Sequence, residues 1–206
     1  IMRKLLLGAL LLLSTLSFSQ SKNVDKMSKD EMLSEMNGNY NLDENNNVTI
    51  TQTLDIPNVT KDELYVKVLT YFTYNYKDGE SVIQVQDKEN GLIIGKGIYK
   101  NSHVGVDLLL KEISTWHIIR VDIKDNKIRV IVTLTQYDLK MSGGNSLPTY
   151  NSYTIGSTFP INSKGSMEKL FTKSLYKSII LAKNSIKSIE KSLIDGNTSK
   201  LETKEW

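Results

Sequence analysis

Residues 115–137 read TWHIIRVDIKDNKIRVIVTLTQY, and this stretch decides the fold. Apolar and polar residues alternate on both sides of Asp125-Asn126, as they do in two half-buried strands. Asp125-Asn126 is a two-residue connection suited to a type I′ hairpin turn. Such a turn places Lys124 opposite Lys127, and every earlier pair follows from it. We therefore predict an antiparallel hairpin with a fixed register.

This register divides the side chains of the hairpin between two faces of a sheet. The aliphatic face holds His117, Ile119, Val121 and Ile123 opposite Leu134, Val132, Val130 and Ile128. The mixed face holds Trp116, Ile118, Arg120 and Asp122 opposite Thr135, Thr133, Ile131 and Arg129. The first face needs a cover, whereas the second, with its cross-strand pair of Asp122 and Arg129, suits solvent. We expect an antiparallel sheet that is covered on one side.

Composition and charge bound the class of protein. The 206 residues are 39% apolar and 24% charged, which is ordinary for a globular protein with one domain plus targeting and tail segments. The formal net charge is +3, but without residues 1–19 it falls to +1, with 24 basic against 23 acidic residues. This balance gives no electrostatic reason to expect a nucleic-acid partner. The chain has no cysteine, so disulfides, thiolate chemistry and a lipidated cysteine are excluded.

The N-terminus has the three parts of a secretory signal peptide. Arg3 and Lys4 precede the apolar run of residues 5–16, which is short for a bilayer span, and Ser17-Phe18-Ser19 supplies small residues for cleavage before Gln20. The alternative is an uncleaved anchor. We predict a signal peptide over 1–19 and export to the periplasm or the exterior of a Gram-negative bacterium, not as a lipoprotein.

The rest of the chain divides into a linker, one domain and a tail. Residues 20–47 are predicted to be a polar linker, with a short helix where Ser28 and Glu31 form a capping box. The domain is predicted over 48–195 and a polar tail over 196–206. Its expected elements are strands over 48–56, 82–87 and 92–100, helices over 61–76 and 166–194, a strand extension or edge ribbon over 102–114, a loop over 140–148 and an irregular segment over 150–161.

The predicted C-terminal helix is amphipathic. Its apolar sector holds Phe171, Leu175, Ile179, Ala182, Ile186, Ile189 and Leu193, and its opposite sector holds Lys169, Lys173, Lys177, Lys183, Lys187 and Lys191. One interpretation is a helix that covers the sheet and presents its lysines to water. The other is a basic surface that lies against anionic lipid or a polyanionic envelope polymer.

No motif predicts catalysis, a metal or a cofactor. The two histidines, His103 and His117, are not part of an HxxxH or HExxH pattern, and there is no GxSxG nucleophile elbow. Gly95-Lys96-Gly97 resembles a phosphate loop, but neither its spacing nor the residue after the lysine fits one. Glycines there are more typical of a bulge or a close backbone approach. A hydrolase is therefore the last of our hypotheses.

The uncovered face of the sheet is the best candidate for a binding site. Exposed tryptophan, isoleucine and arginine together are typical of a recognition surface. The residues in question are Trp116, Arg120, Asp122, Arg129, Ile118 and Ile131. The alternative is burial of this face under 102–114, under 140–161 or against a second copy in a homodimer. The leading hypothesis is an exported, non-catalytic binding domain of the cell envelope whose partner is a protein or an envelope polymer.

Several short segments resemble a known family. They are Ile56-Pro57, Lys61-Asp62-Glu63-Leu64-Tyr65, Gly91-Leu92-Ile93-Ile94-Gly95-Lys96-Gly97, the turn and strand over 124–130, and Phe159-Pro160-Ile161. With the order β-α-β-β-β-β-α and an export signal, residues 48–194 resemble a family of secreted bacterial proteins described as a domain of unknown function with a TBP-like fold. The resemblance implies an α+β fold in which a curved antiparallel sheet carries two helices on one face. It implies no catalytic residue, and likeness to a DNA-bending fold does not transfer DNA binding. Residues 102–114 depart from the resemblance, because they are longer than so compact a repeat needs.

Overall fold

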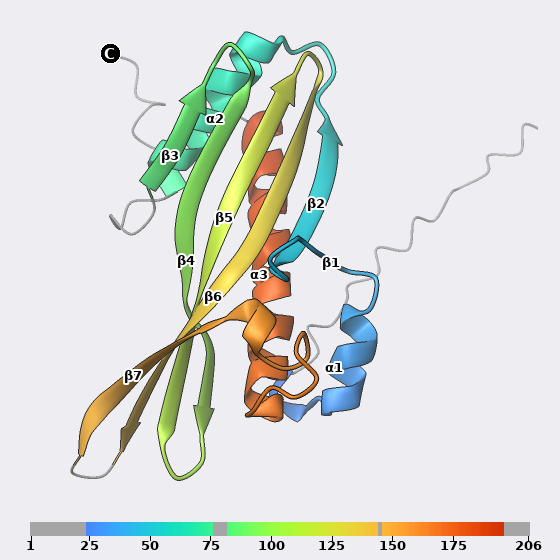
Figure 1. The fold of residues 1–206 in the computed structure, drawn as a ribbon. Helices are drawn as coiled ribbons and strands as arrows, with labels where there is room; N and C mark the ends of the chain where they lie inside the picture. Colours follow the sequence, from blue (N-terminus) through green and yellow to red (C-terminus); the bar gives the residue numbers. More distant parts are fainter. Residues whose placement is uncertain (1–23, 76–81, 144–145, 196–206) are drawn as a thin grey trace, which may run out of the picture.

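The computed structural model describes residues 24–75, 82–143 and 146–195 (Figure 1). Within these residues the chain forms three α-helices and an antiparallel sheet of seven strands. The helices are α1 (Lys29–Met36), α2 (Lys61–Asn75) and α3 (Glu168–Asp195). The strands are β1 (Asn41–Leu42), β2 (Val48–Asp55), β3 (Val82–Asp87), β4 (Leu92–Val106), β5 (Leu110–Lys124), β6 (Lys127–Gly143) and β7 (Ser146–Thr154). Short 3₁₀ turns lie at Val24–Lys26 and Ile155–Ser157. The strand order is β1-β2-β6-β5-β4-β3, and β7 pairs with the far half of β6.

The hairpin of β5 and β6 has the predicted register over most of its length. Every predicted pair from Lys124 and Lys127 out to His117 and Leu134 is present. Beyond it the register shifts by one residue, so that Trp116 lies opposite Gln136 and not opposite Thr135 as predicted. The predicted type I′ turn is also wrong, because Asn126 has a φ of 62° but Asp125 does not have a positive φ.

The reason for this turn lies in the neighbouring helix. The Asp125 carboxylate accepts a hydrogen bond from the backbone N–H of Lys61 at 2.8 Å, in the first turn of α2. The predicted capping box is present as well, since Thr60 and Glu63 exchange hydrogen bonds at 2.9 and 3.3 Å. The hairpin turn and the start of α2 are therefore fixed to each other, and orphan N–H groups of the helix are satisfied.

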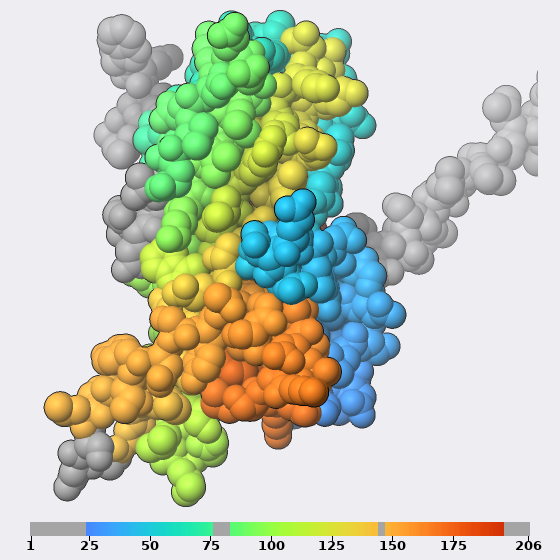
Figure 2. Space-filling view, viewed as in Figure 1, coloured from blue at the N-terminus to red at the C-terminus, as the bar shows by residue number. Residues whose placement is uncertain are grey.

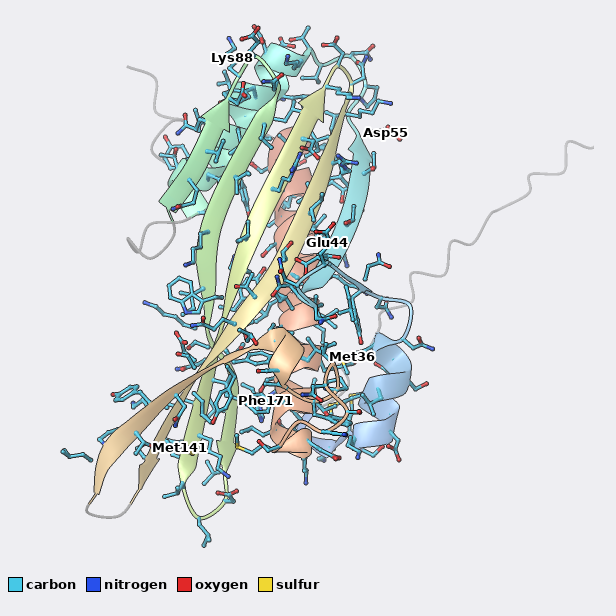
Figure 3. The ribbon with its side chains drawn as sticks, in the orientation of Figure 1. Met36, Glu44, Asp55, Lys88, Met141 and Phe171 are labelled. Carbon is cyan, nitrogen blue, oxygen red and sulfur yellow. The ribbon has the colours of Figure 1, made fainter. Side chains whose placement is uncertain are left out.

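The aliphatic face of the sheet is covered by α2 and α3 (Figure 1). Ile119, Val121, Val130 and Val132 are each at most 1% exposed. The entire predicted apolar sector of α3, from Phe171 to Leu193, is buried. Phe171 anchors the beginning of α3 by packing against the rings of Tyr137 and Tyr153 (Figure 3). The α+β, TBP-like fold class is thereby confirmed.

The predicted polar linker over 20–47 requires correction in its described part. The capping box at Ser28 is present, since its hydroxyl accepts from the N–H of Glu31 at 3.1 Å, and it begins α1. This helix packs on α3, with Met27, Met32 and Met36 in the core (Figures 1 and 3). The short helix was predicted, but so few apolar positions in a polar segment did not predict that it packs into the core. The predicted signal peptide, residues 20–23 and the tail over 196–206 lie outside the described residues.

The sheet extends well beyond the predicted hairpin. The expected strand extension over 102–114 is present, because β4 and β5 continue to Val106 and Leu110. The loop predicted over 140–148 is instead largely strand, because β6 continues to Gly143 and pairs with β7. The segment over 150–161 is strand only to Thr154, and from Ile155 on it is irregular, as predicted, apart from one 3₁₀ turn. The resulting ribbons project past the beginning of α3 (Figure 1), and Leu108 and Leu147 there are 97% and 89% exposed. Strands with no buried face lack the alternation by which they could be recognised.

Truncating Met32, which is fully buried, tests whether α1 is part of the fold. Met32→Ala should lower the free energy of unfolding by about 2–5 kcal/mol, the usual cost of such a cavity. Ser34→Ala, on the exposed side of α1, should change it by less than about 0.5 kcal/mol. Urea denaturation measures both values. Equal stability of the two variants would show that α1 does not contribute to the core.

Gly91 is the position at which the β3–β4 turn meets the central hairpin. Its φ is 65°, and a Cβ there would lie 2.4 Å from the backbone oxygen of Ile123. Gly91→Ala should therefore lower the melting temperature more than Gly38→Ala, whose φ is 72° but whose Cβ would meet no atom within 4 Å. Both variants share the strain of a left-handed alanine, about 1–2 kcal/mol. Equal melting temperatures would mean that the contact with Ile123 is not constraining.

Candidate functional site on the open sheet face

The six predicted recognition residues lie on the face of the sheet that carries no helix. Figure 2 shows the upper part of this face, formed by β2 to β6. Arg120 and Arg129 are exposed, whereas Trp116, Ile118, Asp122 and Ile131 are half-buried. The predicted cover by 102–114 is absent in the described residues, since that segment continues the plane of the sheet.

One cluster on this face joins two arginines through one carboxylate. The Arg120 guanidinium donates to one oxygen of Asp122 at 2.9 Å, and Arg129 donates to the other at 2.7 and 2.9 Å. Partial burial opposes ionisation of Asp122, but the bonds from Arg129 and Arg120 hold its pKa below the ordinary value. The arginines are thus oriented by Asp122 while much of each side chain remains in water.

A second cluster surrounds Trp116. The indole N–H donates to the Asp138 carboxylate at 2.6 Å, and the other oxygen of Asp138 accepts from Gln136 at 2.9 Å and from Ser152 at 2.7 Å. The Lys96 ammonium lies 4.7 Å from the centre of the indole ring. Burial would raise the pKa of Asp138, but the three hydrogen bonds, and the charge of Lys96, lower it. Trp116 is therefore held in one orientation.

The register shift after Trp116 creates this second cluster. On β6, Ile128, Val130, Val132 and Leu134 face the helices, but after the shift the inward residues are Tyr137 and Leu139. An extra residue at Thr135 has the geometry of a β-bulge, which reverses the alternation of every later side chain. Gln136 and Asp138 consequently lie on the open face, opposite Trp116 and Ser114.

A groove lies beside the second cluster, where β7 meets the projecting part of the sheet. Its volume is about 470 Å³. Its lining includes Ile98, Ser114, Asp138, Tyr150 and Asn151. Tyr150 is 72% exposed. At the same place the Lys140 ammonium lies 2.7 Å from the Glu112 carboxylate, so this charge pair is already formed.

Sequence reasoning missed five residues of this site: Lys96, Gln136, Asp138, Tyr150 and Ser152. For Gln136 and Asp138 a signal existed, since the apolar positions run 128, 130, 132 and 134 and then 137, 139 and 141. A step of three in a period of two marks a bulge. Tyr150 and Ser152 had no such signal, because most side chains of β7 are exposed and its sequence therefore shows no alternation of apolar and polar residues.

The predicted lysine face of α3 is divided by the N-terminal segment. Lys173 and Lys177 donate to the backbone and the carboxylate of Asp25, both at 3.1 Å, and Lys183 donates to Asn39 at 2.6 Å. The other three, Lys169, Lys187 and Lys191, are exposed. α1 and the residues around it therefore occupy part of this surface, and the six lysines do not form one open face.

Neither histidine lies on the open face. His117 points into the core as predicted, is 1% exposed and stacks on Tyr99 with a centroid separation of 3.9 Å. His103 is 4% exposed and lies near α3. In the described part of the chain no group of three or more His, Cys, Asp or Glu residues is placed to hold a metal ion. None of the described helices has the length and apolar character to cross a bilayer.

A curved antiparallel sheet with its helices on one face and an open opposite face defines a TBP-like α+β domain. Residues 51–138 match the family model described as "Domain of unknown function (DUF4468) with TBP-like fold". The resemblance predicted from the sequence is confirmed by this match over residues 51–138.

Solved structures of similar fold come from two related bacteria. A DUF4468 family protein from Bacteroides ovatus superposes with a TM-score of 0.56 and 15% identity, over 79% of this chain and 94% of that one. A TBP-like protein from Parabacteroides distasonis superposes with a TM-score of 0.52 and 14% identity, over 77% of this chain and 98% of that one. At such identities the likeness shows the fold alone. No curated protein matches the chain.

The buried histidines should make stability depend on pH. Burial lowers the pKa of His117 to about 4, and burial together with the charges of Lys177 and Lys173 lowers that of His103 to about 4. In the unfolded chain both bind protons near pH 6.5. Their stabilising contribution is therefore complete above about pH 6.5 and is lost as the pH falls towards about 4.

Urea denaturation at several pH values between 7 and 4.5 measures this loss. His117→Gln should reduce the slope of stability against pH, whatever its effect on stability at pH 7, because one of the two titrating groups has been removed. Stability that does not change over this interval in the native chain would contradict burial of the neutral imidazoles.

Proposed function

We propose that this chain is an exported, non-catalytic binding domain of the bacterial cell envelope that engages its partner through the open face of the sheet. The observation that carries this proposal is the immobilised Trp116 beside a groove of about 470 Å³, on the face that no helix covers. The signal-peptide pattern of residues 1–19 supports the location.

The arrangement suits binding because its side chains are ordered before any partner arrives. The hydrogen bond to Asp138 fixes the Trp116 ring, so little rotamer entropy remains to be lost on association. Aromatic and arginine side chains are also those that contribute most at binding surfaces. The face offers both, with Trp116 and Tyr150 near the groove and Arg120 and Arg129 further along the same strands.

The lining of the groove favours a hydroxyl-rich envelope polymer as the partner. Amide, hydroxyl and carboxylate groups of Asn101, Asn151, Ser114 and Glu112 line it beside the ring of Tyr150. Such groups hydrogen-bond neutral hydroxyls, while an aromatic ring contacts an apolar sugar face. Nucleic acid is not favoured, because the carboxylates of Asp122, Asp138 and Glu112 offset most of the positive charge of the arginines and lysines beside them on the same face.

The two other functions considered from the sequence have less support. Attachment through the lysine face of α3 would have Lys169, Lys187 and Lys191 as its exposed lysines, since the other three are half-buried against residues 25 and 39. For a hydrolase, neither histidine is available as a general base on the open face, because both lie on the opposite side of the sheet.

Two aromatic truncations test the proposed surface. Trp116→Ala and Tyr150→Ala should each weaken retention on insoluble cell-wall polymer by about tenfold or more, as expected of aromatic residues at a binding hot spot. Tyr74→Ala, on α2 and 38% exposed, is the matched control and should change retention less than about twofold. Co-sedimentation at several polymer concentrations gives the apparent affinities.

Thermal unfolding of the same variants separates binding from folding. Tyr150→Ala should leave the melting temperature unchanged, because its side chain is 72% exposed. Loss of stability in Trp116→Ala with unaltered retention in Tyr150→Ala would make Trp116 a structural residue and overturn the proposal. Retention by the polymer that neither variant alters would do the same, and capture of a protein or a second copy instead would reject the polymer.

A further inference from the structure

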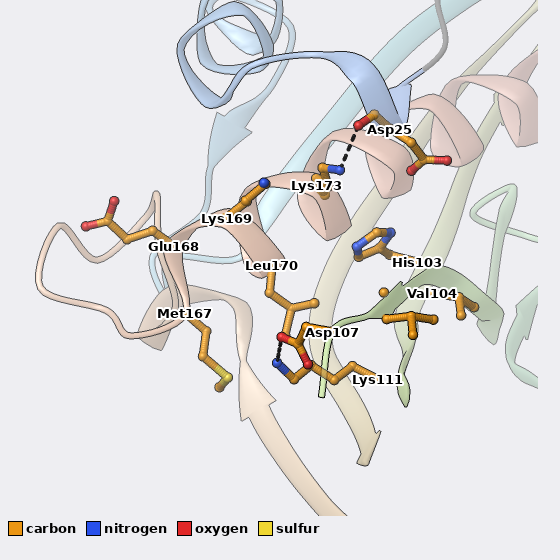
Figure 4. A pocket seen from close by; sticks show the side chains of 12 residues that line it. Asp25, His103, Val104, Asp107, Lys111, Met167, Glu168, Lys169, Leu170 and Lys173 are labelled. Carbon is orange, nitrogen blue, oxygen red and sulfur yellow. Dashed lines mark hydrogen bonds and ion pairs between the residues drawn. The ribbon is translucent and has the colours of Figure 1, made fainter. Parts of the chain in front are cut away.

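A larger cavity lies away from the open face, between the projecting end of β4 and the beginning of α3 (Figure 4). Its volume is about 600 Å³, within the range of small-molecule sites. The strand residues are Val104, Gly105 and Val106, and the helix residues include Leu170 and Lys173. Nothing in the envelope-binding function proposed above depends on this cavity, so it requires its own explanation.

Two lysines in the lining of the cavity are not ion-paired with any carboxylate that the structure describes. Three carboxylates in its lining each have a lysine partner: Asp107 with Lys111 at 2.6 Å, Glu168 with Lys29 at 2.7 Å, and Asp25 with Lys177 at 3.1 Å. Lys169 and Lys173 also line it, and among the described residues neither is ion-paired with a carboxylate. Lys173 donates only to the backbone oxygen of Asp25.

His103 supplies an independent sign that a polar ligand belongs here. It lies in the wall of the cavity, faces Lys173 and Asp25 (Figure 4), and is 4% exposed. Its Nδ1 has no hydrogen-bond partner among the described residues. A buried polar atom without a partner is uncommon and costs free energy, so the polar groups at this end of the cavity are not fully satisfied by the protein. The first turn of α3 adds the partial positive charge of a helix N-terminus.

The remaining lining is apolar and open to water. Val106 is 77% exposed and Val104 is 43% exposed, although both are strand residues beside a cavity. Met167 and Leu170, at the beginning of α3, also line the cavity. Apolar side chains left exposed in a concave site are those that a bound aliphatic group would cover.

We propose that this cavity binds a small amphiphile, with an anionic head group at Lys169, Lys173 and His103 and an aliphatic chain along Val104, Val106 and Leu170. The lysines attract the head group, and the chain removes the valines from water. The geometry assigns the site to a free amphiphile and not to a membrane surface, because the groups lie in a cavity between a strand and a helix.

Dodecanoate below its micelle concentration is the first probe, and isothermal titration calorimetry on the full chain measures its affinity. Lys169→Met and Lys173→Met should each weaken binding by about tenfold, the loss of about 1.4 kcal/mol expected for a charge-assisted contact. Lys187→Met, an exposed lysine of α3 away from the cavity, is the matched control. For the aliphatic part of the ligand, Val106→Ser should weaken binding, whereas Leu147→Ser, at an exposed residue outside the cavity, should not.

Three further probes test separately whether the charge of the head group and the aliphatic chain are needed for binding. Dodecyl phosphate should also bind, because its head group is anionic. Weaker binding of dodecyl phosphate than of dodecanoate would show that the site prefers a carboxylate head group. Acetate at the same concentration should not bind, because it has no chain. Dodecyltrimethylammonium has the chain with the opposite charge and should not bind. Equal binding of the cationic amphiphile, or equal affinity in the Lys169→Met and Lys187→Met variants, would overturn the proposal.

The titration of His103 gives a readout that does not depend on the affinity. Its pKa is lowered to about 4 by burial and by Lys177 and Lys173, with Asp25 acting in the opposite direction. A bound anion beside these lysines should raise the pKa of His103 and leave that of His117 unchanged. Proton NMR of the two imidazoles, assigned with His103→Gln, measures both. Dodecanoate binding with an unchanged His103 pKa would place the ligand elsewhere and contradict the proposed site.

Discussion

The register between β5 and β6 is the constraint on which the rest of the structure depends. It gathers the aliphatic residues of both strands on one face, and that face determines where α2 and α3 must pack. The turn between the strands adds a direct link, because Asp125 caps α2 and Asn126 bonds to residues 56 and 59. Strand pairing, helix position and the start of α2 are consequently set by one hairpin.

One extra residue on β6 converts this hairpin from a structural element into a candidate site. Before Thr135 the open face of β6 carries Arg129, Ile131 and Thr133, whereas after it that face carries Gln136 and Asp138. Without the shift, Asp138 would point towards the helices as an unpaired buried carboxylate, at a high desolvation cost. With it, Tyr137 and Leu139 fill the core at 1% exposure each, and Asp138 orients Trp116. The bulge therefore places apolar side chains in the core and polar side chains on the open face at the same time.

The sequence predicted the parts of the fold whose residues alternate against a buried face. These parts are the hairpin as far as His117 and the apolar sector of α3. The sequence also predicted the capping box of α2, from the local pair of Thr60 and Glu63. It did not predict α1 as core, because the few apolar residues of 20–47 are scattered through a polar segment. It did not predict β7 either, because most of the side chains of that strand are exposed. Of the candidate site, it predicted Trp116 and the arginine cluster but not Asp138 or Tyr150, which a register shift and an unpatterned strand bring into place.

The two proposed sites lie on opposite sides of one sheet, and this separation has a physical reason. Stability is concentrated on the helix side, where the aliphatic residues are removed from water, so the polar pairs of the open face contribute little to it. The cavity is on the helix side but at its margin, where β4 extends past the first turn of α3 and the core ends. His103 lies at this margin, and its Nδ1 has no hydrogen-bond partner among the described residues. Helices on one side of the sheet leave the other face open, and a sheet longer than its helices leaves a cavity at their end. The residues of both places can change in sequence without loss of the core.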